Sequence, residues 1–149
     1  MDRIMKKMLL SALAVAALAV TPAMAWEVAI TAQQLPQEAQ KFLKMYFAQN
    51  RVVAASQDKD VTDNDYTVIL DNGIKIEFDA RGKWESVKSH VGKMPAGVVP
   101  DKIQGYITEH YPSFGIEKIE RKRYGYEVEL TNDLDLKFDA NGKFVGIDD

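Results

Sequence analysis

The sequence contains the same pattern twice, and this duplication restricts the possible folds more than any other feature. Residues 78–84 (FDARGKW) recur sixty positions later as residues 138–144 (FDANGKF). Upstream of this segment the offset between the copies is 64, and residues 36–47 match residues 100–111. The offset is larger there because the first copy has four extra residues between its helix and its second strand. Two copies of one supersecondary unit predict a domain in which equivalent units stack and share a core.

Each unit is predicted to begin with an amphipathic helix. Apolar residues recur at three- and four-residue spacing within 39–47 and again within 103–111, with polar residues on the opposite face. Pro36 and Pro100 stand at the first turn of these helices, where a missing N–H group costs nothing.

Antiparallel strands follow each helix. Alternating apolar and polar residues predict strands at 66–70 and 74–78. A three-residue loop with Gly73 in the left-handed conformation places Leu70 opposite Ile74, which keeps the apolar side chains on one face. The second copy has the same pattern at 126–130 and 134–138.

Two further strands complete each unit. A type I turn at 79–82 places Trp84 opposite Phe78 and assigns both to the core, and a strand is expected before the hairpin in each copy, at about 52–57 and 116–123. The predicted fold class is α+β: two tandem helix-plus-four-stranded antiparallel sheet repeats, with the helices packed on one sheet face. The pattern is compatible with one continuous sheet or with two.

The N-terminus indicates export. A basic start, an apolar stretch at 9–20 and the small-residue site Ala23-Met24-Ala25 predict a signal peptide over residues 1–25, cleaved before Trp26. The apolar stretch is shorter than the roughly 20 residues of a membrane-spanning helix, so no membrane span is expected after cleavage. The remainder, 26–149, is predicted to be a single duplicated periplasmic or secreted domain. Repeat one covers about 33–90 and repeat two about 97–149.

Composition excludes several classes of protein. The chain has no cysteine, which excludes a disulfide scaffold and a thiol nucleophile. Residues 1–25 hold three of the 19 basic residues and one of the 22 acidic ones, so the remainder has a net charge of −5. This charge argues against nucleic acid as a partner.

No pattern typical of an active site is present, so an enzyme is not expected, and neither is a cofactor. The two histidines, His90 and His110, lack the spacing of a zinc site, and His110 falls on the apolar stripe of its helix, which predicts a packed and hydrogen-bonded structural role. The acidic run 58–65 has the oxygen-rich composition that calcium favours, but it lacks the glycine and glutamate of an EF-hand loop. A solvated loop is the simpler interpretation, and no metal ligand is assigned.

The duplicated unit also resembles a known family. The helix pattern Leu35-Pro36…Phe42…Tyr46-Phe47 and the strand pattern Tyr66…Gly73-Ile74-x-Ile76-x-Phe78-Asp79-x-x-Gly82-Lys83-Trp84, both with counterparts in copy two, are similar to those of the PepSY-like family. That family is related in architecture to secreted β-lactamase-inhibitor proteins, although this chain lacks the cysteines that cross-link those inhibitors. The resemblance implies a sheet with helices on one face and a second, often concave, face that can hold a protein or peptide.

The sequence therefore predicts an exported, non-enzymatic binding module, inhibitor-like in kind, whose partner is a protein or peptide of the cell envelope. The predicted binding residues are those on the sheet face away from the helices, and Trp26 and Tyr124 are additional candidates for contact. The alternatives are a small-ligand or calcium-binding periplasmic sensor that uses the acidic loop 58–65, and a hydrolase with scattered catalytic residues. The residues predicted for the outer face are Thr67, Ile69, Lys75, Glu77, Glu127, Glu129, Asp135 and Lys137.

Overall fold

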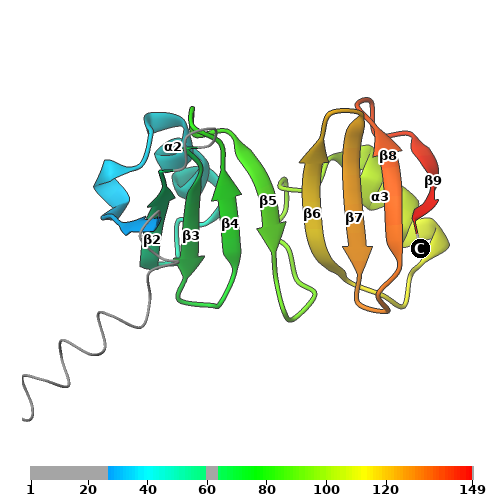
Figure 1. Ribbon diagram of the computed structural model, residues 1–149. Helices are drawn as coiled ribbons and strands as arrows, with labels where there is room; N and C mark the ends of the chain where they lie inside the picture. Colours follow the sequence, from blue (N-terminus) through cyan, green and yellow to red (C-terminus); the bar gives the residue numbers. More distant parts are fainter. Residues whose placement is uncertain (1–26, 60–63, 149) are drawn as a thin grey trace, which may run out of the picture.

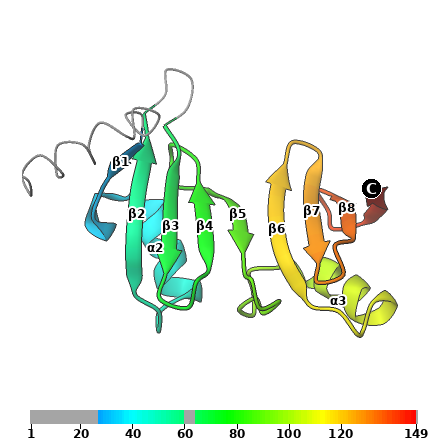
Figure 2. The ribbon, with the colours of Figure 1, turned by 60° about the horizontal axis from the view of Figure 1, so that its bottom comes forward.

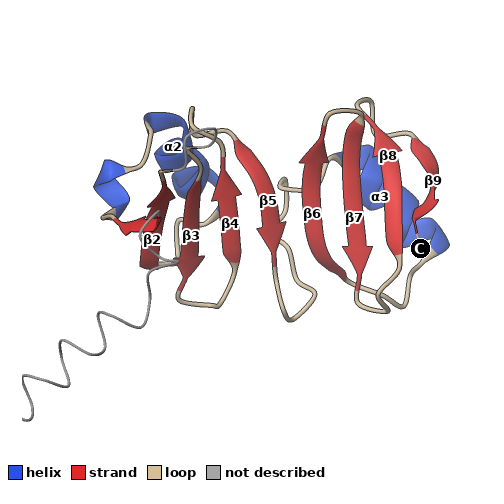
Figure 3. Ribbon diagram, in the orientation of Figure 1, coloured by secondary structure: helices blue, strands red, loops and turns tan. Residues whose placement is uncertain are grey.

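The structure, a computed structural model, describes residues 27–59 and 64–148. The described chain forms two helices, a short 3-10 helix and nine strands (Figures 1 and 3). In chain order these are β1 (Glu27–Ala29), η2 (Ala32–Gln34), α2 (Gln37–Tyr46), β2 (Val52–Asp58), β3 (Tyr66–Leu70), β4 (Lys75–Phe78), β5 (Trp84–Lys88), α3 (Asp101–His110), β6 (Ile116–Lys122), β7 (Gly125–Leu130), β8 (Asp135–Asp139) and β9 (Phe144–Asp148). None of the described helices is long and apolar enough to cross a membrane.

All nine strands belong to one antiparallel sheet, in the order in which they occur in the chain. The two repeats are joined at the centre, where β5 pairs with β6 and Val87 lies opposite Ile119. The duplication has therefore produced one continuous sheet. Strand β1, at the edge beside β2, is an addition to the eight predicted strands.

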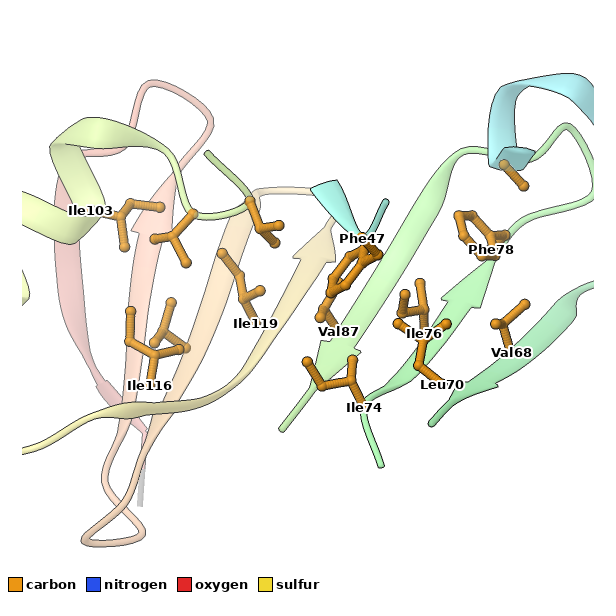
Figure 4. Close-up of a cluster of buried hydrophobic side chains, with 14 of the residues drawn as sticks. Phe47, Val68, Leu70, Ile74, Ile76, Phe78, Val87, Ile103, Ile116 and Ile119 are labelled. Atoms are coloured by element: carbon orange, nitrogen blue, oxygen red, sulfur yellow. The ribbon is translucent and has the colours of Figure 1, made fainter. Parts of the chain in front are cut away.

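The molecule has two layers, because both helices cover the same face of the sheet. Helix α2 lies behind the strands of repeat one and α3 behind those of repeat two (Figures 1 and 2). Val87 and Ile119 are both 0 % exposed, so the apolar layer continues across the junction between the repeats (Figure 4). The α+β prediction, with helices on one sheet face, is confirmed.

The predicted registers are also confirmed. Tyr66 pairs with Phe78 in repeat one, and Tyr126 pairs with Phe138 in repeat two. Gly73 has a φ of +85°, as the three-residue loop requires. Its counterpart Asp133 adopts a φ of +68°, a conformation that aspartate tolerates better than most residues with a Cβ atom.

The turn after β4 packs against the beginning of the helix of its own repeat. The Asp79 carboxylate accepts hydrogen bonds from the backbone N–H groups of Arg81 and Lys83, both at 2.9 Å. A Cβ atom on Gly82 would lie 2.8 Å from the Pro36 Cβ, so the glycine permits this close approach. The strand that follows carries Trp84 under α2, where its ring stacks on Phe42 at 6.0 Å between centroids. Repeat two has the same turn, with Asp139 as the acceptor.

Candidate functional site

The eight residues predicted for the outer face all lie on the sheet face opposite the helices. They alternate along their strands with buried residues such as Val68 and Val128, which face the helices. The register brings them together in four cross-strand pairs: Thr67 with Glu77, Ile69 with Lys75, Glu127 with Lys137, and Glu129 with Asp135.

Strands β5 and β6 lie between these two groups and add side chains that the sequence interpretation missed. Ser86 pairs with Glu120, and Lys88 pairs with Lys118. One row of paired residues therefore crosses the outer face and changes in character from apolar to cationic and then to anionic. In order across the sheet it consists of Ile69, Lys75, Lys88, Lys118, Glu129, Asp135 and Asp148.

An apolar hollow of about 470 Å³ opens on the outer face of repeat one. It exists because small side chains at Ala29 and Ala54 leave space beside the larger Ile69. The hydroxyl of Ser56 donates a 2.9 Å hydrogen bond to the Glu27 carboxylate at its rim. The residues that line the hollow are Glu27, Ala29, Ala54, Ala55, Ser56, Thr67, Ile69 and Lys75.

Repeat two has a cluster of carboxylates at the corresponding place, which we call the acidic patch: Glu120, Glu127, Glu129 and Asp135. Together with Lys118 they line a small cavity of about 100 Å³. Glu120 lies directly opposite Glu127, and Glu129 directly opposite Asp135. Like charges at opposed positions of a sheet repel each other, and the only ion pairs that the described residues make with this patch join Glu120 to Lys118 (3.3 Å) and Lys122 (3.5 Å).

This crowding affects the ionisation of the patch. Partial burial, followed by the negative charges of Asp135 and Glu117, raises the pKa of Glu129. Burial, with the negative charges of Glu127, Asp148 and Glu120, likewise raises the pKa of Asp135. At neutral pH both groups carry charges that the fold disfavours.

We predict that Glu129→Gln raises the stability of the domain at pH 7. In the interval between the ordinary and the raised pKa of Glu129, the folded state binds more protons than the unfolded state. The stability therefore falls as the pH rises through this interval. Removing the charge should add about 0.5 kcal/mol to the free energy of unfolding at pH 7, and the gain should disappear below about pH 4. Urea unfolding at both pH values measures this.

Glu77→Gln is the matched control, because Glu77 occupies the outer face of repeat one and lies 3.5 Å from a lysine, Lys75. It should give no gain in stability. Equal stabilisation by the two variants would contradict the assignment of repulsion to the acidic patch.

Tyr124, one of the two additional contact candidates, lies at the tip of the β6–β7 hairpin beside this patch. Its hydroxyl donates a 3.2 Å hydrogen bond to Glu127, and the Lys137 ammonium lies 5.8 Å from its ring centre. Burial and the adjacent Glu127 raise the pKa of Tyr124 to about 12, so the hydroxyl stays protonated and remains a donor. The other candidate, Trp26, lies outside the described residues.

The histidines do not take part in this surface. His110 is exposed, so it does not lie on the buried stripe of its helix, but its ring stacks on Tyr106 at 4.0 Å and its Nδ1 lies 3.0 Å from the Tyr106 carbonyl oxygen, in agreement with the predicted packed and hydrogen-bonded role. Among residues 27–59 and 64–148, no three His, Asp or Glu side chains are placed to hold a metal ion.

Positions 60–63 of the acidic run 58–65 lie outside the described residues. The two ends of this run are joined by a 2.8 Å hydrogen bond from the backbone N–H group of Asp58 to the carbonyl oxygen of Asp65.

Comparison with known proteins gives close relatives of the whole domain. A "putative calcium-regulated periplasmic protein" from Bacteroides thetaiotaomicron superposes with a TM-score of 0.78 at 39% identity, covering 83% of this chain and 97% of that one. A "putative periplasmic protein from DUF2874 family" of Bacteroides vulgatus gives a TM-score of 0.76 at 40% identity over 84% of this chain and 98% of that one. A "putative periplasmic protein of unknown function" from Bacteroides vulgatus gives a TM-score of 0.77 at 31% identity over 83% of this chain and 99% of that one.

No curated protein gives a significant match. The periplasmic assignment of all three relatives confirms the predicted localisation. Residues 64–146, more than half of the chain, match the family described as "Putative beta-lactamase-inhibitor-like, PepSY-like". The chain thus belongs to the PepSY-like family, as the pattern of its repeats predicted.

Proposed function

We propose that this protein is a non-enzymatic binding protein that recognises a protein or peptide of the cell envelope through its outer sheet face. The observation that carries this proposal is the row of residues from Ile69 to Asp148, in which an apolar hollow, three lysines and an acidic group follow one another across the sheet. Along this row residues of like charge lie next to one another, whereas a surface needed only for solubility has charges of both signs interspersed.

The dimensions of this surface favour a macromolecule over a small ligand. Small-molecule sites are usually concave and enclose most of the ligand. Here the hollow of about 470 Å³ could hold a small ligand, but it is partly open to solvent, and the lysines of β4, β5 and β6 separate it from the acidic patch, which holds only about 100 Å³. A partner that contacts both must extend over several strands, as a folded protein or an extended peptide can.

The acidic patch further supports a functional role, because its carboxylates are expected to lower stability. Opposed carboxylates such as Glu129 and Asp135 repel each other across β7 and β8. Residues that violate the rules of stable sheets are typical of functional surfaces. A cationic segment of the partner would relieve this repulsion, and an apolar side chain beside it would fill the hollow.

The test is affinity capture from envelope extract with the chain lacking residues 1–25, followed by mass spectrometry and measurement of the dissociation constant. The double variant Lys75→Glu/Glu129→Lys reverses one charge in each half of the outer face and keeps the net charge. We expect it to bind the captured partner at least tenfold more weakly, equivalent to about 1.4 kcal/mol.

The matched control is Glu38→Lys/Lys41→Glu on α2, which exchanges an exposed ion pair of 3.7 Å on the opposite face and also keeps the net charge. It should leave binding unchanged. If the outer-face variant binds the partner as tightly as the unaltered chain, the outer face is not the binding surface.

A calcium sensor is the second candidate, favoured by the description of the 39% identical relative as calcium-regulated. The loop 58–65 is rich in the Asp and Asn side chains whose oxygen atoms calcium favours as ligands. Thermal melting in millimolar CaCl₂ and in EDTA distinguishes the candidates, because a ligand of the folded state alone raises the melting temperature. A rise that Asp58→Asn abolishes would support this candidate, and equal melting temperatures would eliminate it.

A further inference from the structure

Strands β5 and β9 occupy equivalent positions in the two repeats but have different surroundings. Val87 of β5 pairs with Ile76 and is 0 % exposed. Ile147, sixty positions later in β9, pairs in the same way with Leu136 but is 51 % exposed. The same position of the repeat is therefore core in one copy and surface in the other.

The difference arises from the next strand. In repeat one, β6 pairs with the second edge of β5 and places Ile119 opposite Val87, with Ser86 opposite Glu120. In the described sheet β9 is the last strand and has no neighbour on that side. An edge strand of this kind presents backbone N–H and C=O groups to an incoming strand.

The first strand of repeat one does have an additional strand beside it. Strand β1 pairs with β2 so that Ala29 lies opposite Ser56. Ser56 of β2 is equivalent to Glu120 of β6, which lies sixty-four positions later in the sequence. Ser56 pairs with Ala29 of β1, and Glu120 pairs with Ser86 of β5. Strand β1 is therefore the neighbour of β2 in the same way that β5 is the neighbour of β6. Of the first and last strands of the two repeats (β2, β5, β6 and β9), β9 is the one that has no additional strand beside it in the described sheet.

We propose that the β9 edge accepts an extended antiparallel strand from another protein, with an apolar side chain beside Ile147 and a cationic side chain beside Asp148. The apolar side chain corresponds to Ile119 in the β5–β6 junction. The cation follows from charge: Asp148 lies opposite Asp135 and is 3.7 Å from one lysine, Lys137. Addition of a strand to a sheet edge is an established mode of peptide recognition. The backbone edge of β9 and Ile147, which lies on the helix-covered side like its partner Leu136, are separate from the outer face; Asp148 is the residue that the two proposed surfaces share.

The chain itself provides a probe of this chemistry. A synthetic peptide with residues 115–123, which contains β6, would place Ile119 against Ile147 and Lys118 against Asp148 in the register of the β5–β6 junction. Within the molecule, Lys118 instead lies opposite Lys88. The peptide should therefore match β9 better in charge than β6 matches β5.

The experiment is titration of this peptide into the isotopically labelled chain lacking residues 1–25, followed by NMR and amide hydrogen exchange. We expect saturable shifts and slower exchange at residues 146–148. Ile147→Asp in the protein, or Ile119→Asp in the peptide, should weaken binding at least about tenfold. Val53→Asp is the matched control: Val53 is 56 % exposed but lies on β2, far from β9 in the order of the strands, so its effect should be small.

Three outcomes would overturn the proposal. Absence of any shift in β9 at millimolar peptide would show that this edge does not accept a strand. Equal binding by the Ile147→Asp variant would show that Ile147 is not part of the contact. A dimer in sedimentation experiments that Ile147→Asp dissociates would show that the occupant is a second copy. The variant Lys75→Glu/Glu129→Lys should bind the peptide normally, so failure of the outer-face proposal and failure of this one can be told apart.

Discussion

Phe78→Ala is expected to reduce the free energy of unfolding by about 3–5 kcal/mol. The Phe78 ring is 0 % exposed and meets the Phe42 ring of α2 edge-on at 5.8 Å, so it connects the sheet to its helix. Alanine would leave a cavity between the two layers. Since domains of this size are stable by about 5–15 kcal/mol, the loss is a large part of the total.

Urea unfolding followed by circular dichroism measures this effect, and the duplication provides the comparison. Phe138 is also 0 % exposed and meets Tyr106 of α3 edge-on at 5.6 Å. Phe138→Ala should therefore cost a similar amount. A loss below about 1 kcal/mol for either variant would contradict the close packing described for these sites.

Gly125→Ala is expected to destabilise the domain by about 3 kcal/mol or more, because the added Cβ atom would collide with backbone atoms at the end of β8. Gly125 begins β7, is buried and has a φ of +151°. A Cβ atom there would lie 2.7 Å from the Ala140 nitrogen and would also collide with the Phe138 carbonyl oxygen. The β7 and β8 strands would have to separate at this end.

The matched control is Gly146→Ala in β9, where an added Cβ atom meets nothing within 4 Å. That change should alter the stability by less than about 1 kcal/mol, and in the stabilising direction, because alanine loses less backbone entropy on folding. Thermal unfolding of the two variants under identical conditions makes the comparison. Similar melting temperatures would show that β7 can move away from β8 at little cost.

The registers within each repeat could be predicted from sequence because local chemistry determines them. Loop length and the requirement for one apolar face fix the pairing of Leu70 with Ile74. Strand β1 could not be predicted, since three residues show no periodicity and their partner strand is about thirty residues away. Pairing between β5 and β6 was also unpredictable, because the long connection between them carries no turn signal that sets a register.

The same reasoning explains what was predicted of the candidate site. All eight expected residues lie on the outer face, since alternation along a strand is sufficient to assign a face. The middle of the surface, with Lys88, Lys118 and Glu120, depends on the β5–β6 pairing and so was missed. The hollow was missed because it results from the small side chains of Ala29 and Ala54 on β1 and β2.

Pairing between β5 and β6 also fixes the distance between the two halves of the outer face. Adjacent strands lie about 4.8 Å apart, so Lys75 on β4 and Asp135 on β8 are held about 19 Å apart by four strand spacings. Because no flexible hinge separates the halves of the sheet, a partner with matching groups at this spacing engages the second half without a further loss of orientational freedom. Binding at one half would raise the effective concentration of the partner at the other half, so two weak contacts would give a higher overall affinity. A partner with the wrong spacing would bind through only one half and would lack this increase in affinity.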